Sequence, residues 1–238
     1  MKKYITTILI AAACTGISSC KKDKTTVATV TSAQNGLAYV QVLSGTVNAA
    51  RNYVYVDNVP VTGAAIAFGG QFPAAAAYAF GIAGGAHTIV IKDTLATSTQ
   101  VPLSFQETFE SGKKYTIFTY DTITAAKKLT VTDDIVTPTD TTARLRFANL
   151  MYNSTAAPNV DVFSFLKNAN VFTNIPTATV SPFIPYVSVI TDTLYVRETG
   201  TSVLLAKVAV AFTKQRSYTA FIRGSYKGTK TAATLISY

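Results

Sequence analysis

The feature that most constrains the fold is an internal repeat with a spacing of about 105 residues. Five short segments recur in the same order: residues 38–42 with 143–147, 52–56 with 159–163, 88–92 with 193–197, 115–118 with 218–221, and 129–131 with 235–237. The offsets are 105, 107, 105, 103 and 106, so they vary only by amounts that loop insertions explain. The repeat predicts two copies of one structural unit.

The recurring segments favour β-strands, because they alternate apolar and polar residues and are rich in Val, Ile, Thr, Tyr and Phe. Each copy has about 100 residues and room for some seven short strands, which is typical of a β-sandwich. We therefore expect a first sandwich over residues 36–136 and a second over 143–238. Residues 137–142, which contain Pro138, have the composition of a linker.

The first residues have the organisation of an export signal. Lys2 and Lys3 form a short positive region, and residues 4–13 are mostly apolar but too few to span a bilayer as a helix. Residues 17–20 read Ile-Ser-Ser-Cys, which resembles the lipobox of bacterial lipoproteins. That resemblance implies cleavage of residues 1–19 and diacylglycerol attachment at Cys20. The alternatives are an ordinary secretory signal or a cytosolic chain with an apolar start.

Residues 20–35 are then the lipidated cysteine and a flexible tether. The lysines after Cys20 resemble the start of Bacteroidetes-type lipoproteins, in which charged residues at this place influence surface export. The expected location is the outer membrane, on its periplasmic side or on the cell surface, with the acyl chains as the contact to the lipid. Two or more such chains give a stable anchor.

Each copy also resembles the domain of unknown function 4397. The motifs that carry the resemblance are Ala143-Arg-Leu-Arg-Phe147, Pro158-Asn-Val-Asp-Val162 and Gly112-Lys-Lys-Tyr-Thr116, together with the glycine-rich approach to residues 88–92. The second copy departs from the pattern, since Thr191-Asp192 stands in place of the glycines. The family is found in tandem in extracellular and lipid-anchored bacterial proteins. The resemblance implies two tandem Ig-like antiparallel β-sandwiches and no assigned activity.

The sequence offers few groups for catalysis. His87 is the only histidine, and its counterpart in the second copy is Asp192, so we interpret it as a surface or strand-end residue. Both cysteines, Cys14 and Cys20, precede the repeats, so a disulfide framework is excluded there. The best carboxylate cluster, Asp133-Asp134, is too small for calcium. We expect no enzyme, no metal and no cofactor; a glycan-active hydrolase with paired carboxylates is the alternative.

Positive charge is concentrated in the second copy. Residues 143–238 contain ten Lys or Arg and three Asp or Glu, whereas residues 36–136 contain six and seven. Arg144 and Arg146 are two apart and should project from the same face of a strand. A positive face could meet an anionic glycan, lipid phosphates or an acidic protein, or it could simply be solvated. Export makes nucleic acid an unsuitable partner.

Aromatic residues gather in a Gly- and Ala-rich segment that contains Tyr78 and Phe80. They could stack on sugar rings or pack in the core. The candidate ligand-binding residues are therefore Arg144, Arg146, Tyr78 and Phe80. The leading hypothesis is a non-catalytic envelope module for binding, adhesion or spacing, with a protein or glycan partner. An accessory subunit of an outer-membrane uptake or secretion complex is the alternative from a different class.

Overall fold

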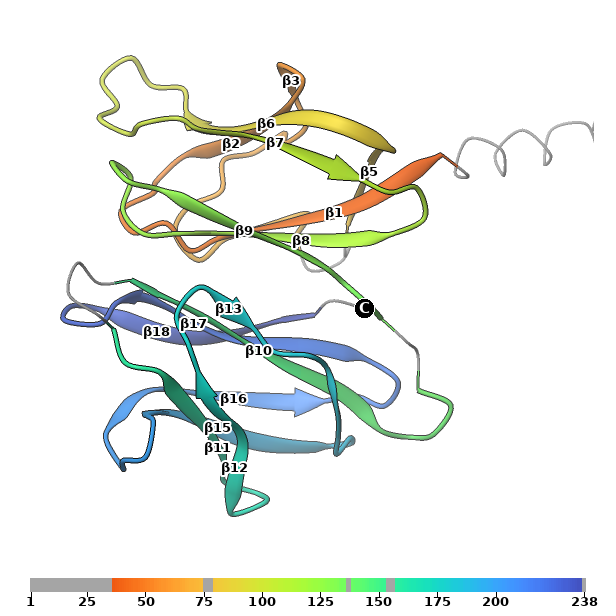
Figure 1. The fold of residues 1–238 in the computed structure, drawn as a ribbon, viewed down its shortest axis with the longest axis vertical. Helices are drawn as coiled ribbons and strands as arrows, with labels where there is room; N and C mark the ends of the chain where they lie inside the picture. Colours follow the sequence, from red (N-terminus) through yellow and green to blue (C-terminus); the bar gives the residue numbers. More distant parts are fainter. Residues whose placement is uncertain (1–35, 75–78, 136–137, 153–156, 237–238) are drawn as a thin grey trace, which may run out of the picture. The chain divides into compact units, whose positions relative to one another are not determined.

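The computed structural model describes residues 36–74, 79–135, 138–152 and 157–236, and their regular structure is entirely β-strand (Figure 1). In these ranges no helix has the length and apolar character needed to cross a membrane. The export signal, Cys20 and the tether lie outside the described residues.

The first sandwich consists of a five-stranded and a four-stranded sheet. The five-stranded sheet contains β1 (Leu37–Ser44), β4 (Gln71–Phe72), β5 (Phe80–Ala83), β8 (Lys114–Tyr120) and β9 (Lys127–Thr132). The four-stranded sheet contains β2 (Asn52–Val56), β3 (Val59–Pro60), β6 (Gly85–Asp93) and β7 (Leu103–Phe109). The strand orders are β4-β1-β8-β9, with β5 also paired to β1, and β3-β2-β6-β7.

The second sandwich repeats this arrangement strand for strand. Its five-stranded sheet contains β10 (Ala143–Tyr152), β13 (Thr179–Val180), β14 (Ile184–Tyr186), β17 (Ser217–Ser225) and β18 (Lys230–Ile236). Its four-stranded sheet contains β11 (Val160–Ser164), β12 (Ala169–Ile175), β15 (Ile190–Glu198) and β16 (Leu204–Phe212). The orders β13-β10-β17-β18 and β12-β11-β15-β16 reproduce those of the first sandwich, with β14 paired to β10 as β5 is to β1. The predicted fold class, two tandem all-β sandwiches, is confirmed.

The strand pairing adds one feature to the expected antiparallel pattern. β1 pairs with β8 in parallel, and β10 pairs with β17 in parallel, whereas the other ladders are antiparallel. Parallel neighbours require a long crossover between them, and here the intervening strands supply it. Alternation of apolar residues does not report strand direction, so the sequence pattern could not reveal these two pairs.

For two of the five matched segments, the structure gives a different register from the one that the sequence repeat predicts. Val54 lies opposite Ile91 and Val162 opposite Val196, so β2 corresponds to β11 at an offset of 108 rather than 107. Phe118 pairs with Leu129 and Phe221 with Ala233, which makes the offset of the last strands 104 rather than 106. A shift of one residue exchanges the two faces of a strand. Matching Asn52 with Asn159 therefore assigns the core-facing residues of β2 to the face of β11 that points away from the core, and the reverse.

A tyrosine fixes the same corner in both sandwiches. The hydroxyl of Tyr115 accepts a hydrogen bond from the Glu110 backbone N–H at 3.0 Å, and that of Tyr218 accepts one from the Thr213 N–H at 2.9 Å. Each tyrosine therefore bonds five residues back, across the turn that leads into β8 or β17. This is the tyrosine corner known from Ig-like sandwiches, and it explains the Tyr-Thr motif of the two copies.

The two five-stranded sheets pack against each other, and Figure 1 shows them as the two inner layers. Leu43 and Phe118 of the first sandwich form a buried cluster with Ala148, Leu150 and Phe221 of the second. Each of these sheets is thus covered on both faces, because its other face meets the core of its own sandwich. Residues 35–238 accordingly form one compact unit.

Candidate functional site

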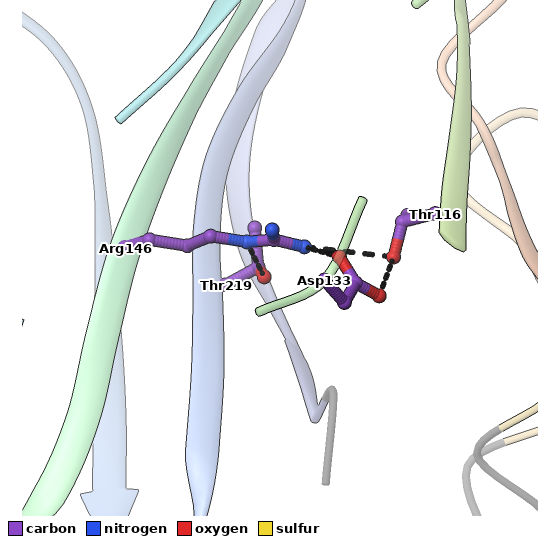
Figure 2. A network of polar contacts seen from close by, with 4 residues as sticks. All are labelled: Thr116, Asp133, Arg146 and Thr219. Atoms are coloured by element: carbon purple, nitrogen blue, oxygen red, sulfur yellow. Dashed lines mark hydrogen bonds and ion pairs between the residues drawn. The ribbon is translucent and has the colours of Figure 1, made fainter. Parts of the chain in front are cut away.

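A buried ion pair joins the two sandwiches at the edge of their contact. The guanidinium Nη2 of Arg146 lies 2.6 Å from Oδ1 of Asp133, and the two side chains are 3% and 4% exposed. Figure 2 shows the polar groups around the pair: the Thr116 hydroxyl donates to Asp133 Oδ2 at 2.7 Å, and Arg146 Nε donates to the Thr219 hydroxyl at 2.8 Å. Hydrogen bonds on both partners are what a buried pair requires to offset its desolvation.

Arg146 also lies over an aromatic ring. Its Cζ atom is 4.5 Å from the ring centroid of Phe183, which lies between β13 and β14 and is half-buried. This distance is within the range of a cation–π contact. The ion pair and the ring are therefore held together as one rigid element at the junction of the sandwiches.

Three hollows surround this element and share Asp134 as a lining residue. Their volumes are about 390, 410 and 380 Å³. The first is lined by Asp134, Arg144, Phe183, Pro185 and Ser217. The second adds Arg146 and the segment from Val180 to Pro182, and the third adds Tyr39, Lys113 and Lys114. We refer to the three together as the junction groove.

The junction groove presents net positive charge. Asp133 is neutralised by Arg146, whereas Arg144 makes no side-chain hydrogen bond or ion pair within the described part of the chain, although its charge helps to lower the pKa of Asp140. Lys113 and Lys114 lie on the other side of Asp134. Asp134 is thus an exposed carboxylate in a groove that is also lined by Arg144, Lys113 and the ring of Phe183.

The acidic residues of the second sandwich do not balance its cations at the surface. Asp161 and Asp192 are buried, and Glu198 accepts a hydrogen bond from the Tyr226 hydroxyl at 2.8 Å. Burial disfavours the charged form of Asp161, but N–H groups of Asn174 and Gly200 hold the pKa of its carboxyl below the usual value. Two of the three carboxylates of residues 143–238 are therefore buried, whereas Arg146 is the one buried cation among the ten.

The structure brings some of the predicted binding residues together. Arg144 and Arg146 line neighbouring hollows of the junction groove, as expected for residues two apart on one strand, but Arg146 is committed to Asp133. Phe80 packs on the first core, with its ring centroid 5.4 Å from that of Phe72. Tyr78 lies outside the described residues. The sequence reasoning missed Phe183 and Tyr39, which no pattern distinguishes from core aromatics.

His87 and Asp57 form a second ion pair, in the first sandwich. His87 Nδ1 is 2.6 Å from Asp57 Oδ2, and Nε2 donates to the Ala83 carbonyl oxygen at 2.9 Å. Both ring nitrogens therefore face acceptors, and the side chain is only 14% exposed. The hydrogen bond to Asp57 raises the pKa of His87 above 6.5, against the effect of burial. The same bond lowers the pKa of Asp57.

We expect this pair to make the stability of the first sandwich depend on pH. Because the pKa of His87 is raised on folding, its contribution is complete below the unfolded value of 6.5 and is lost as the pH rises through the folded value. Chemical denaturation between about pH 6 and about pH 9 should show a loss of unfolding free energy that His87→Gln reduces. An identical pH profile in the variant would contradict the assignment. The Asp57 contribution is lost only at acidic pH.

Asp192, the counterpart of His87, is the centre of a buried network instead. Its Oδ2 accepts hydrogen bonds from Ser164 Oγ and the Tyr186 hydroxyl, both at 2.5 Å, and its Oδ1 accepts the Leu166 N–H. Burial works against ionisation, yet these donors keep the pKa of Asp192 below its usual value. The described residues contain no group of three or more His, Cys, Asp and Glu that could hold a metal ion.

A family model for a domain of unknown function, DUF4397, matches residues 38–163. The chain belongs to the DUF4397 family. The match runs from β1 to β11 and so includes Thr116, Asp133 and Arg146, three of the four residues in the buried network between the sandwiches. The family resemblance expected from the sequence motifs is confirmed. No curated protein matched the DUF4397 chain.

Among solved structures, the DUF4397 chain is similar to a family 26 carbohydrate-binding module from Eubacterium rectale Amy13K, solved in complex with maltoheptaose. The TM-score is 0.28 and the identity 10%, over 83% of this chain and 96% of that one. It is also similar to the TIE protein of Bacillus anthracis, with a TM-score of 0.25 and 12% identity, over 80% of this chain and 33% of the other. At these scores neither likeness bears on what the DUF4397 chain binds.

Proposed function

We propose that this protein is a non-catalytic, lipid-anchored module of the cell envelope that binds an anionic glycan in the junction groove. The observation that carries the proposal is the cation Arg144, which lines the groove beside Phe183 and makes no ion pair within the described residues, although its charge acts on the nearby carboxylate of Asp140. A cation left unpaired at a groove is available to an anionic ligand, and an arginine fork suits a carboxylate or sulfate group.

The remaining lining residues fit a sugar chain. The ring of Phe183 provides an apolar face, and the exposed carboxylate of Asp134 provides an acceptor for hydroxyl groups. The ion pair beneath Phe183 holds this ring in place before a ligand arrives. Groups that are ordered in advance lose little conformational entropy on binding, which favours affinity.

The chemistry of the described residues supports binding over catalysis. His87 uses both ring nitrogens within the fold, so it has no free nitrogen to act as a general base. The Asp192 network is buried and its members bond one another. The placement in the outer membrane, on the periplasmic side or the cell surface, rests on the lipobox-like residues at Cys20.

Binding to charged polysaccharides tests the proposal. We expect the protein to bind dextran sulfate or polygalacturonate and not to bind uncharged dextran. Arg144→Gln should weaken binding at least about tenfold, because it removes charge-assisted hydrogen bonds to the ligand. Asp134→Asn should strengthen binding to the charged polymers, since it removes a like charge from the groove. Isothermal titration calorimetry or surface plasmon resonance at two salt concentrations measures both.

Arg51→Gln is the matched control. Arg51 is an exposed arginine just before β2, outside the junction groove, and the same change there lowers the net charge equally. Equal losses with Arg51→Gln and Arg144→Gln would mean that only the overall charge matters. That result, or binding of uncharged dextran with the same affinity, would overturn the proposed site.

A further inference from the structure

Four exposed apolar side chains lie in two loops at one end of the second sandwich, and we call them the apolar tip. Phe165 and Leu166 lie in the turn between β11 and β12, and Val189 and Ile190 lie where β15 begins. Val189 is 81% exposed and Phe165 68%. Such residues are normal singly, but here two loops at one end of the sandwich both carry them, and the ring of Phe165 lies 6.4 Å from that of Tyr195.

Backbone hydrogen bonds show that the two loops belong to the same end of the sheet. The Phe165 N–H donates to the Thr193 carbonyl, and the Leu166 N–H donates to the Asp192 carboxylate. The Val189 N–H donates to the Phe212 carbonyl at 2.7 Å, which places the turn from β16 to β17 beside the loop before β15. Three loops therefore meet at this end.

Val189 has a backbone conformation that disfavours its own side chain. Its φ is +61°, in the left-handed region that β-branched residues rarely adopt. Asparagine or glycine would suit this position better, so an exposed valine here is costly to the free protein. Strained, exposed residues of this kind are a sign of a contact surface.

Cations surround the apolar tip. Lys167 follows Leu166, with its Nζ 4.4 Å from the ring centroid of Tyr186, and Lys214 and Arg216 lie in the turn after β16. Within the described residues, Lys167 and Lys214 form no ion pair, and the nearby Asp192 is buried in its own network. Apolar side chains ringed by Lys and Arg suit an interface of acyl chains and anionic headgroups.

The described chain begins at the same end. Gly36 bonds to Gly84 and Ser111, in the first sandwich's counterparts of the loops at the apolar tip. β1 and β10 run in the same direction, because Arg146 lies next to Thr116, level with Gln41, while Leu150 lies next to Gly45. The described part of the chain therefore begins at the end that carries the apolar tip. Fifteen residues, from 21 to 35, separate Gly36 from the expected anchor at Cys20.

We propose that the apolar tip docks on a membrane surface that contains anionic lipids, with Phe165 and Val189 entering the headgroup region. The docking does not depend on a ligand in the junction groove, and it can be measured without acyl chains. Charge complementarity and the position of Gly36 favour a lipid surface over a protein partner, because only residues 21–35 lie between Gly36 and the expected anchor at Cys20.

Vesicle flotation of the chain from residue 20 onwards, with Cys20→Ser, tests the proposal. We expect more binding to vesicles of phosphatidylglycerol and phosphatidylcholine than to phosphatidylcholine alone. The double variant Phe165→Ser, Val189→Asn should lower the partition coefficient at least about tenfold, through the loss of buried apolar area. Lys167→Gln with Lys214→Gln should remove most of the preference for the anionic lipid.

The controls separate docking from misfolding. Val203→Asn changes an equally apolar, exposed residue at the opposite end of the sandwich, where β16 begins, and should leave flotation unchanged. Asn suits the positive φ of residue 189. The Tm of the double variant Phe165→Ser, Val189→Asn should therefore equal or exceed that of the parent. Equal flotation of the parent and the tip variant would overturn the proposal. The proposal would also be overturned if the parent bound no vesicles and instead co-purified with an envelope protein that the tip variant failed to bind.

Discussion

Arg146→Leu is expected to destabilise the protein by about 3–5 kcal/mol, because it leaves Asp133 charged and buried between the sandwiches without its partner. The Thr116 hydroxyl would remain as a donor to this carboxylate, but a neutral donor cannot replace a guanidinium at 2.6 Å. Urea denaturation followed by circular dichroism measures the change. A loss below about 1 kcal/mol, the level of surface pairs, would contradict the interpretation.

Two comparison variants make this test sharper. Lys127→Met breaks the ion pair between Lys127, which is largely exposed, and Asp121. It should lower the free energy of unfolding by no more than about 1 kcal/mol. The double variant Arg146→Leu, Asp133→Leu removes both buried charges and should recover most of the stability. If the double variant remained as unstable as Arg146→Leu, packing rather than the unpaired charge would explain the loss.

Cys20→Ser is expected to move the protein from the membrane fraction to the soluble fraction of cells. Without the sulfur no diacylglycerol can be attached, and the apolar tip alone would bind lipid weakly and in a salt-dependent manner. Fractionation with a salt wash, followed by mass spectrometry of the N-terminal peptide, measures the effect. An unmodified Cys20 in the membrane-bound parent would refute the anchor. Cys14→Ser, within the expected signal, is the matched control and should change nothing.

The periodicity of the sequence predicted the sandwiches but not the contact between them. The strands β8, β10 and β17 are buried along most of their length, in contrast to β2, β6 and β15, where burial alternates. Long apolar runs are the mark of a sheet covered on both faces. Residues 147–151 show such a run, interrupted only by Asn149, but a run of this kind does not say what covers the sheet.

The candidate site shows a similar division. The spacing of Arg144 and Arg146 predicted a shared strand face, which the junction groove contains. Their different roles arise from Asp133, whose approach to Arg146 depends on how the sandwiches pack. Asn52 and Asn159, which the sequence repeat matches, have different environments in the structure. Asn52 is buried and accepts a hydrogen bond from Gln100, whereas Asn159 donates to Asn174 at an exposed position.

The contact through Phe118 and Phe221 also restricts how such a module can occur. A chain with a single copy would leave a wide apolar sheet in water, and it would have to cover that sheet by pairing with a second chain or with another protein. Duplication within one polypeptide supplies the cover at a fixed one-to-one ratio and at any expression level. Each sandwich therefore permanently covers the apolar sheet face of the other. Separating the two sandwiches by proteolysis should yield two insoluble fragments.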